Sequence, residues 1–320
     1  MRFILFFICL QIYLYANGHI FVYHRFDDPR YKSADTTTKQ LIEQFEYFKN
    51  NNYQVVSLKK IYAKLKNKES IPSNWVALTI DDAYKSFYNN GLKIFKKYNY
   101  PFTLFVYTKA TNKEYGDFMT WDMLKETSKY GEIALHSHTH PHLTYLINKE
   151  VYQDTKQAYT IFEKKMGFKP KYYAYPYGEF NQAVENEIKK FNFDMILNQN
   201  SGSLNQNTNI NSVNRVALVG KVNIKQKLKY KTLNVKWIEP MKFPDDGILK
   251  KIKAQVSKDI KRIKLYITGE GWVDLKVKDG IISHKLNVKL KRSRTRIILS
   301  TDHYNIATKI IIKKRNKNGK

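Results

Sequence analysis

Cysteine is nearly absent from this chain of 320 residues, in which Cys9 is the only one. Cys9 lies in an apolar N-terminal stretch that we expect to be removed, so the mature chain would contain no thiol. Disulfide bonds and thiolate metal sites are therefore excluded. The residue before Cys9 is not small, which argues against a lipid-attachment site.

An apolar run long enough to cross a membrane is also missing. The N-terminal stretch from Phe3 to Tyr15 is shorter than the roughly 20 residues that a bilayer requires. Arg2 precedes it and Ala16-Asn17-Gly18 follows it, which is the pattern of a cleaved signal peptide over residues 1–18. We therefore expect an exported protein, periplasmic, cell-surface or secreted, without an integral span after cleavage. A permanent anchor is the alternative.

Acidic residues are scarce: 28 Asp and Glu stand against 56 Lys and Arg, a net charge of +28. From residue 221 onward the chain holds 28 basic and 8 acidic residues. An exported chain does not meet nucleic acid, so the partners expected for this basic region are an anionic wall or surface polymer, or phospholipid headgroups. A lysine-rich, merely solvated surface explains the charge nearly as well.

Two short polar stretches follow apolar runs that we predict to be buried strands. Asp81 and Asp82 follow Trp75 to Ile80, and the stretch His136-Ser-His-Thr-His140 follows Glu132 to Leu135. One carboxylate and two imidazoles at strand ends form a ligand set for a divalent metal with open positions. The remaining aspartate would be free to act as a base. The pattern predicts a metal-dependent hydrolase.

Apolar runs alternate with helical patterns through the first 220 residues, which predicts an α/β fold. The strands are expected at 19–23, 54–57, 75–80, 103–106, 133–135, 172–175 and 195–197. The helices are expected at 38–50, 84–98, 121–130, 151–166 and 181–191. Seven strands with intervening helices indicate a parallel barrel with its site at the carboxyl ends of the strands.

The pattern changes after Gly220. Five short β-rich segments, at 263–268, 272–277, 281–290, 295–300 and 308–312, are separated by turn signals such as Asp279-Gly280. They predict a small antiparallel sandwich. We therefore expect a signal peptide over 1–18, one domain over 19–220 and a basic, sandwich-like domain over 221–320.

The aspartate pair and the histidine stretch resemble the NodB-like polysaccharide deacetylase family (carbohydrate esterase family 4). Three further segments resemble it in the same order: Tyr23-His24-Arg25-Phe26, Tyr173-Ala-Tyr-Pro-Tyr-Gly178 and Asn198-Gln-Asn-Ser-Gly202. The resemblance covers about residues 19–220 and implies an irregular (β/α)7 barrel. It also implies that Asp81 is the catalytic base and that Asp82, His136 and His140 are the metal ligands.

The resemblance also implies the remaining parts of the site. By this resemblance the backbone N–H of Tyr177, held by Pro176 and Gly178, would stabilise the oxyanion. Apart from the resemblance, the aromatic side chains of Tyr175, Tyr177 and Trp121 are expected to contact sugar rings through their apolar faces. His138 and His142 satisfy the same histidine spacing, but the proline after His140 favours the pair His136 and His140. The metal is expected to be zinc, with cobalt, nickel or iron also suited to these ligands.

Two departures from the commoner pattern of the family stand out. No histidine lies between His142 and His284, so the usual late general acid is missing. The branch that deacetylates poly-N-acetylglucosamine takes its acid from the first strand, and His24 fits that position. The arginine that often orients the base is replaced by Ala174, and Arg25, Asp27 and Asp28 are the candidates to take its place.

The sequence therefore predicts an enzyme that removes N-acetyl groups from N-acetylglucosamine units of a wall or surface polysaccharide. Two alternatives stay open. The same residues would serve an esterase that removes O-acetyl groups, and the missing late histidine would suit a catalytically degenerate glycan-binding protein.

Overall fold

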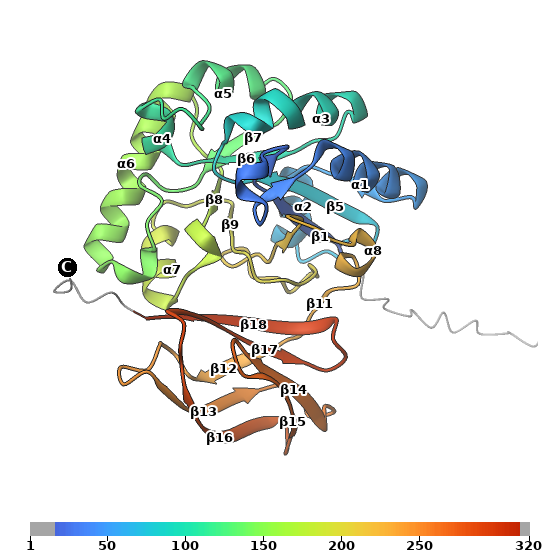
Figure 1. Ribbon diagram of the computed structural model, residues 1–320, viewed down its shortest axis with the longest axis vertical. Helices are drawn as coiled ribbons and strands as arrows, with labels where there is room; N and C mark the ends of the chain where they lie inside the picture. Colours follow the sequence, from blue (N-terminus) through green and yellow to red (C-terminus); the bar gives the residue numbers. More distant parts are fainter. Residues whose placement is uncertain (1–16, 314–320) are drawn as a thin grey trace, which may run out of the picture.

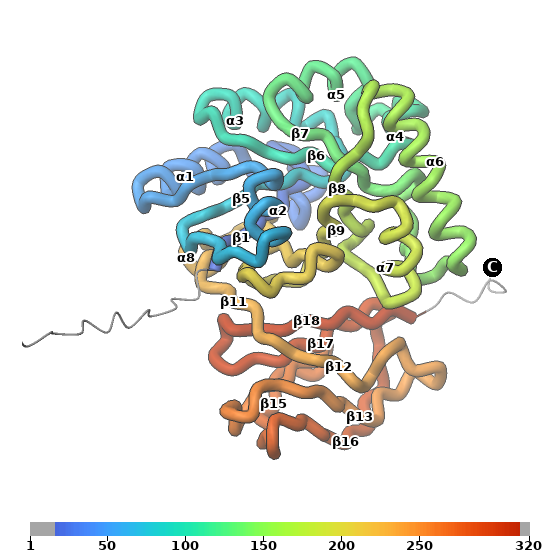
Figure 2. Tube along the Cα trace, turned by 180° about the vertical axis from the view of Figure 1, so that it is seen from behind, coloured from blue at the N-terminus to red at the C-terminus, as the bar shows by residue number. Residues whose placement is uncertain are grey.

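The computed structural model describes residues 17–313, so the predicted signal segment lies, apart from Asn17 and Gly18, outside the described residues. Figure 1 shows an α/β part lying against an all-β part, and Figure 2 shows the same arrangement from behind. The predicted fold class is confirmed: a parallel, barrel-like sheet with helices is followed by antiparallel sheets. Within residues 17–313, no helix has the length and apolar composition for a membrane crossing.

Eight parallel strands build the barrel, in the spatial order β10-β1-β5-β6-β7-β8-β9 with β4 beside β5. Seven of them lie where the sequence predicts strands: β1 (His19–Tyr23), β4 (Gln54–Val55), β5 (Trp75–Ile80), β6 (Thr103–Val106), β7 (Glu132–Leu135), β8 (Tyr172–Ala174) and β9 (Met195–Leu197). Nearly every residue of β1 and β5 is buried. These strands are apolar throughout because helices or the barrel interior cover both of their faces.

A segment that the sequence did not predict as a strand joins the two edges of this sheet. Val213 pairs with Leu197 of β9, and β10 (Val216–Ala217) pairs with β1. Asparagines surround this segment in the sequence, so it has no apolar run that would predict a strand. Its one arginine, Arg215, is carried into the interior of the barrel, where it is fully buried.

The helices lie around the outside of the barrel strands (Figure 1). Thr37 and Gln40 form a capping box at the start of α1, as each side chain accepts a hydrogen bond from the other's backbone N–H. The helices are α1 (Thr38–Asn50), α2 (Leu58–Lys66), α3 (Leu92–Tyr98), α4 (Thr108–Asn112), α5 (Trp121–Thr127), α6 (Asn148–Met166), α7 (Gln182–Lys189) and α8 (Ile224–Lys227).

The helix expected at 84–98 does not run regularly. Its first half is a π turn, η2 (Phe87–Gly91), and the α-helix α3 follows. A Cβ at Gly91 would lie 2.8 Å from the Phe87 ring and 3.1 Å from the Phe26 ring. The tight fit of the backbone against these rings explains why the irregular turn carries a glycine.

Two sheets form the all-β part: β11 (Lys231–Thr232), β18 (Asn305–Ile312), β17 (Arg294–Ser300), β14 (Arg262–Ile267) and β15 (Gly271–Lys276) in one, and β12 (Lys236–Glu239), β13 (Ile248–Gln255) and β16 (Ile281–Lys289) in the other. Their apolar faces share one core. Ile224 and Tyr230 still pack on the barrel core, whereas β11 pairs with β18. A domain boundary at residue 220 stays a proposal.

His19 at the start of β1 ties the barrel to the segment that leads into the second part. It is 3% exposed, and its Nε2 lies 2.8 Å from the carbonyl oxygen of Tyr230. Its other ring nitrogen, Nδ1, is buried without a hydrogen-bond partner. Burial lowers the pKa of His19 to about 4, because a proton on Nδ1 would have no acceptor.

This depressed pKa predicts acid sensitivity of the fold. The unfolded chain binds the proton more readily, so the contribution of His19 to stability is complete above pH 6.5 and declines as the pH falls toward about 4. Between pH 7.5 and 5.5 the loss should be about 1 kcal/mol. Urea unfolding at both pH values should show a smaller pH dependence for His19→Gln than for the wild type. The exposed His303→Gln control should keep the wild-type dependence, and equal dependence in all three proteins would contradict the prediction.

Candidate active site

The two aspartates lie where β5 ends in a left-handed turn. Asp81 donates its backbone N–H to the carbonyl oxygen of Tyr23 on β1, at 2.9 Å. Asp82 and Ala83 then adopt positive φ angles of 72° and 56°. Residues with a Cβ rarely take this conformation, and it recurs at strained functional sites. The turn directs neighbouring carboxylates to two different places.

Asp82, His136 and His140 come together as the sequence predicts. Oδ1 of Asp82 lies 3.5 Å from Nε2 of His136 and 3.2 Å from Nε2 of His140, and the two Nε2 atoms are 3.2 Å apart. Among residues 17–313 these three are the group whose ligand atoms could hold one metal ion. The alternative histidines point elsewhere, since His138 contacts Thr108 and His142 contacts Glu179.

The loop after β7 is held so that His136 presents one defined nitrogen. Nδ1 of His136 lies 2.7 Å from the carbonyl oxygen of Ala174, which can only accept, so Nδ1 carries the proton and the lone pair is on Nε2. Asp154 of α6 accepts hydrogen bonds from the backbone N–H groups of His138 and Thr139, at 2.9 and 3.0 Å. Sequence reasoning missed Asp154, because nothing in a helical pattern marks a carboxylate that turns inward.

Burial and the mutual contacts set the charges of this group. Burial lowers the pKa of His136 to about 4, which leaves it neutral at neutral pH. Burial alone would raise the pKa of Asp82, but the adjacent His140 and His136 lower it well below its usual range. A carboxylate and a neutral imidazole are the forms in which these side chains bind metals.

The three side chains fit a divalent cation. Ligand atoms about 2.1 Å from one ion are about 3.0–3.4 Å apart at octahedral or tetrahedral angles, and the observed separations are 3.2–3.5 Å. Oδ1 of Asp82 is buried and accepts no well-directed hydrogen bond. A cation would satisfy this oxygen, which is otherwise costly to bury.

Asp81 is held by Arg215, which the sequence analysis did not identify. Nη1 and Nη2 of Arg215 lie 2.6 and 2.8 Å from the two carboxylate oxygens of Asp81, and both side chains are fully buried. Nε of Arg215 also donates to the carbonyl oxygen of Asn198, at 2.9 Å. Burial alone would raise the pKa of Asp81, but the Arg215 guanidinium lowers it below its usual value. The Asp81 carboxylate is therefore fixed and ionised.

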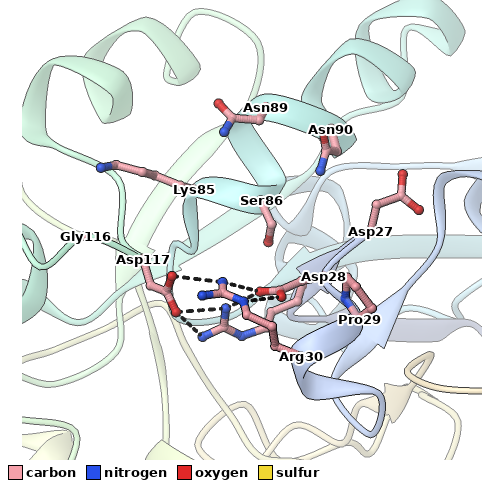
Figure 3. Close-up of a pocket in the computed structure, with 11 residues that line it drawn as sticks. Asp27, Asp28, Pro29, Arg30, Lys85, Ser86, Asn89, Asn90, Gly116 and Asp117 are labelled. Carbon is pink, nitrogen blue, oxygen red and sulfur yellow. Dashed lines mark hydrogen bonds and ion pairs between the residues drawn. The ribbon is translucent and has the colours of Figure 1, made fainter.

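Arg25, Asp27 and Asp28, which the sequence suggested as residues that orient the base, line a separate pocket instead. Arg25 forms ion pairs with Asp28 and Asp117, and Figure 3 shows Asp28, Arg30 and Asp117 side by side in this pocket. The Arg25 guanidinium lies 3.5 Å from the centre of the Tyr84 ring, a residue of the cleft wall. Arg25, held by its ion pair with Asp28, thus packs on the ring of Tyr84. Asp27 accepts a hydrogen bond from the backbone N–H of Thr38 at the start of α1.

An open cleft of about 630 Å³ lies over the metal-ligand group. His24 lines it, and its Nδ1 is buried without a hydrogen-bond partner. Gln199, from the predicted late loop, also lines the cleft and donates to Oδ2 of Asp81 at 3.3 Å. His24, which follows the first strand, and Gln199 of the late loop therefore line the same cleft as Asp82.

Tyr177 also lines the cleft and lies in a tight turn, η4 (Pro176–Gly178), at a φ of 59°. Its ring stacks on His142 at 4.2 Å and meets His140 edge-on at 4.5 Å. The turn packs so closely on the late loop that a Cβ at Gly178 would lie 2.5 Å from the backbone nitrogen of Gln199. Only glycine fits there, which explains the Tyr-Gly pair of the motif.

Arg294 at the start of β17 reaches this turn from the second part of the chain. Its Nε donates to Oε1 of Glu179 at 2.7 Å, and its Nη2 donates to the carbonyl oxygen of Tyr177 at 3.1 Å. Oε2 of the buried Glu179 contacts Nδ1 of His142 at 2.7 Å. The all-β part therefore completes the rim of the cleft, a contribution that no motif in the sequence indicated.

Two rings expected to contact sugar lie elsewhere. Tyr175 is fully buried and stacks on Phe180 at 5.0 Å. Trp121 is 8% exposed and belongs to the core of the barrel. Pro176 is buried and shapes the turn rather than facing the cleft. Of the predicted substrate-binding residues, Tyr177 is the one whose side chain lines the cleft.

Comparisons with known proteins place this arrangement in a family. Residues 68–196 match the family model of polysaccharide deacetylase. Poly-beta-1,6-N-acetyl-D-glucosamine N-deacetylase of Escherichia coli (strain K12) is 27% identical over 241 residues, or 62% of this chain and 35% of that protein. Peptidoglycan-N-acetylmuramic acid deacetylase PdaC of Bacillus subtilis (strain 168) is 31% identical over 43% of this chain and 27% of that protein.

A solved structure shares the fold. The deacetylase PplD of Streptococcus pyogenes, in complex with acetate, superposes with a TM-score of 0.61 at 23% identity, covering 67% of this chain and 98% of that one. The chain spans only about a third of the length of these two curated relatives. These matches confirm the predicted family for the barrel part.

The buried pair of Asp81 and Arg215 predicts a large loss of stability when one partner is removed. Arg215→Met would leave a buried carboxylate uncompensated and should cost about 3–5 kcal/mol. Arg215→Met combined with Asp81→Leu should cost much less than the sum of the single changes. Urea unfolding of the metal-free protein measures both.

The exposed pair of Lys242 and Asp245 provides the control. Lys242→Met should change the free energy of unfolding by less than about 1 kcal/mol. An Arg215→Met variant as stable as this control would contradict the prediction.

Proposed function

We propose that the chain, whose residues 68–196 match the polysaccharide deacetylase family model, is a metal-dependent hydrolase that removes N-acetyl groups from N-acetylglucosamine units of a wall or surface polysaccharide. One observation carries the proposal: Asp82, His136 and His140 surround one point of the cleft, and Asp81 stands beside them, fixed by Arg215. The N-terminal signal pattern supports export to the compartment where such a polymer lies.

A divalent cation held by Asp82, His136 and His140 would supply Lewis acidity to the acetyl carbonyl and to the attacking water. Zinc suits one carboxylate and two imidazoles, and cobalt, nickel or iron are also compatible. We propose that Nε2 of His136 and Oδ1 of Asp82 are ligand atoms, since one is deprotonated and the other lacks a hydrogen bond.

Asp81 would accept the proton of the water as its oxygen attacks the carbonyl carbon. Arg215 keeps the carboxylate ionised and oriented, so it is ready to act as a base without reorganisation. The backbone N–H of Tyr177, in its strained turn, would donate to the developing oxyanion. His24, which also lines the cleft, would donate a proton to the departing nitrogen, releasing acetate and a free amine.

The two alternatives differ in what they require of these groups. A glycan-binding protein without catalysis needs no base fixed by a buried arginine, so the ion pair of Asp81 and Arg215 favours the enzyme. An esterase for O-acetyl groups would use the same residues on an alcohol leaving group, and substrate assays separate the two activities.

Substitution of the two aspartates should separate the base from the metal ligand. Asp81→Asn should lower acetate release from chitopentaose at least about a hundredfold while the zinc content stays at the wild-type level, because only the base is lost. Asp82→Asn should lower both activity and zinc content. Acetate assays and metal analysis of the same samples measure the two effects.

Asp122→Asn is the matched control, since the Asp122 side chain is 94% exposed. It should retain full activity and metal. Removal of the metal with a chelator should abolish acetate release from the wild type, and zinc or cobalt should restore it. Unchanged activity in Asp81→Asn, or in the chelated wild type, would refute the proposed mechanism.

The role of His24 predicts a dependence on the leaving group. His24→Gln should slow the hydrolysis of chitopentaose by about 10²–10⁴-fold, because an amine must be protonated as it leaves. Hydrolysis of 4-nitrophenyl acetate should slow much less, since nitrophenolate leaves without a proton. His284→Gln, on β16 of the second part, should change neither rate. Equal losses on both substrates would mean that His24 positions the site instead.

A further inference from the structure

A second pocket, of about 870 Å³, lies on the five-stranded sheet and meets the catalytic cleft at Arg294, which lines both. Alternate residues of a strand share a face, so Arg294, Arg296 and Ile298 of β17 lie on the same side. The opposite side, with Ile297 and Leu299, packs in the sandwich core. The pocket therefore lies on the face whose Arg294 reaches the barrel.

The pocket is basic and contains no carboxylate. Its lining includes four cationic side chains, Lys291, Arg292, Arg294 and Arg296, and no acidic residue. Arg294 is paired with Glu179. Within residues 17–313 the guanidinium of Arg296 makes neither a hydrogen bond nor an ion pair with a protein group, although it is half-buried. Burial, and then the nearby Arg294, lower the pKa of Arg296.

An unpaired, half-buried guanidinium is costly unless it meets an anion. Arginine is also suited to planar carboxylates and phosphates, which it binds through two parallel hydrogen bonds. The lysine-rich surface elsewhere is solvated and explains nothing about this side chain, which is partly withdrawn from water. The charge of the pocket therefore fits an anionic ligand.

An aromatic platform lies beside these cations. Tyr266 of β14 pairs with Ile298 on one side and with Trp272 of β15 on the other, so the three form a row across the sheet. The ring centres of Tyr266 and Trp272 are 5.2 Å apart, and Trp272 is 48% exposed. Exposed aromatic rings of this kind stack on the apolar faces of sugar rings.

We propose that this pocket is a subsite for an anionic group, a carboxylate or a phosphodiester, on the acetylated polysaccharide whose acetyl group occupies the catalytic cleft. The inference rests on the proposed function and narrows it to an anionic glycan. A neutral glycan would leave Arg296 unpaired. Deacetylation adds a positive charge at each turnover, so the pocket also disfavours product in the subsite.

Direct binding tests the subsite without reference to catalysis. The probes are glycan strands of alternating N-acetylglucosamine and N-acetylmuramic acid, the same strands with methyl-esterified carboxylates, strands that carry teichoic acid, and neutral chitopentaose. Calorimetry at low ionic strength should show that the wild type binds at least one anionic probe about tenfold more tightly than chitopentaose. Tight binding of the carboxylate strands or of the teichoic-acid strands identifies the anionic group.

Arg296→Gln should remove this preference and leave the affinity for chitopentaose unchanged, and Trp272→Ala should weaken binding of all four probes. Arg262→Gln is the charge-matched control, because Arg262 lies on the same sheet but does not line the pocket. Arg292→Gln, in the exposed loop before β17, gives a second test that does not depend on the folding of Arg296→Gln. It should also weaken binding of the anionic probe.

Equal affinity of the wild type for anionic and neutral probes would overturn the subsite, and so would equal losses in Arg296→Gln and Arg262→Gln. Acetate assays distinguish this failure from failure of the proposed function. If the rate of acetate release is the same in the wild type and in Arg296→Gln, and the same on anionic and neutral glycans, the subsite alone is refuted. Arg296-dependent binding without acetate release from any probe would refute the deacetylase.

Discussion

The buried ion pair between Asp81 and Arg215 is the interaction on which the arrangement of the proposed active site depends. Both side chains are fully buried, and neither charge is tolerable there without the other. The pair joins the end of β5 to the segment that closes the barrel between β9 and β1. The segment that closes the barrel therefore also supplies the arginine that orients Asp81, the proposed base.

The rest of the site is built from turns that only a rigid scaffold can hold. Asp82, Ser137, His140 and Tyr177 all have positive φ angles, although none of them is glycine. Each turn follows a buried parallel strand, and side chains from other elements hold these turns, with Asp154 on the histidine loop and Arg294 on the Tyr177 turn. The apolar core thus supports backbone strain at the carboxyl edge of the sheet.

The two parts of the chain act on one cleft. Arg294 is anchored in the all-β part, yet its hydrogen bonds end on Glu179 and Tyr177 in the barrel. Part of the excess positive charge after residue 220 therefore serves to join the all-β part to the barrel. One of these cations, Arg294, pairs with a carboxylate of the barrel, and others line an open pocket beside the cleft.

Seven of the eight barrel strands, the family and the residues around the proposed metal site could be predicted from the sequence. Each of these motifs directly follows a buried apolar run, and the end of that run fixes its position. The folded chain was needed to identify the residue that orients the proposed base and the rings that face the cleft. Arg215 lies in an asparagine-rich segment without a strand pattern. The sequence around Tyr175 does not show whether its ring faces solvent or packs on Phe180, as it does in the structure. Local patterns record the period of burial along the chain, whereas contacts between distant segments depend on how the barrel closes.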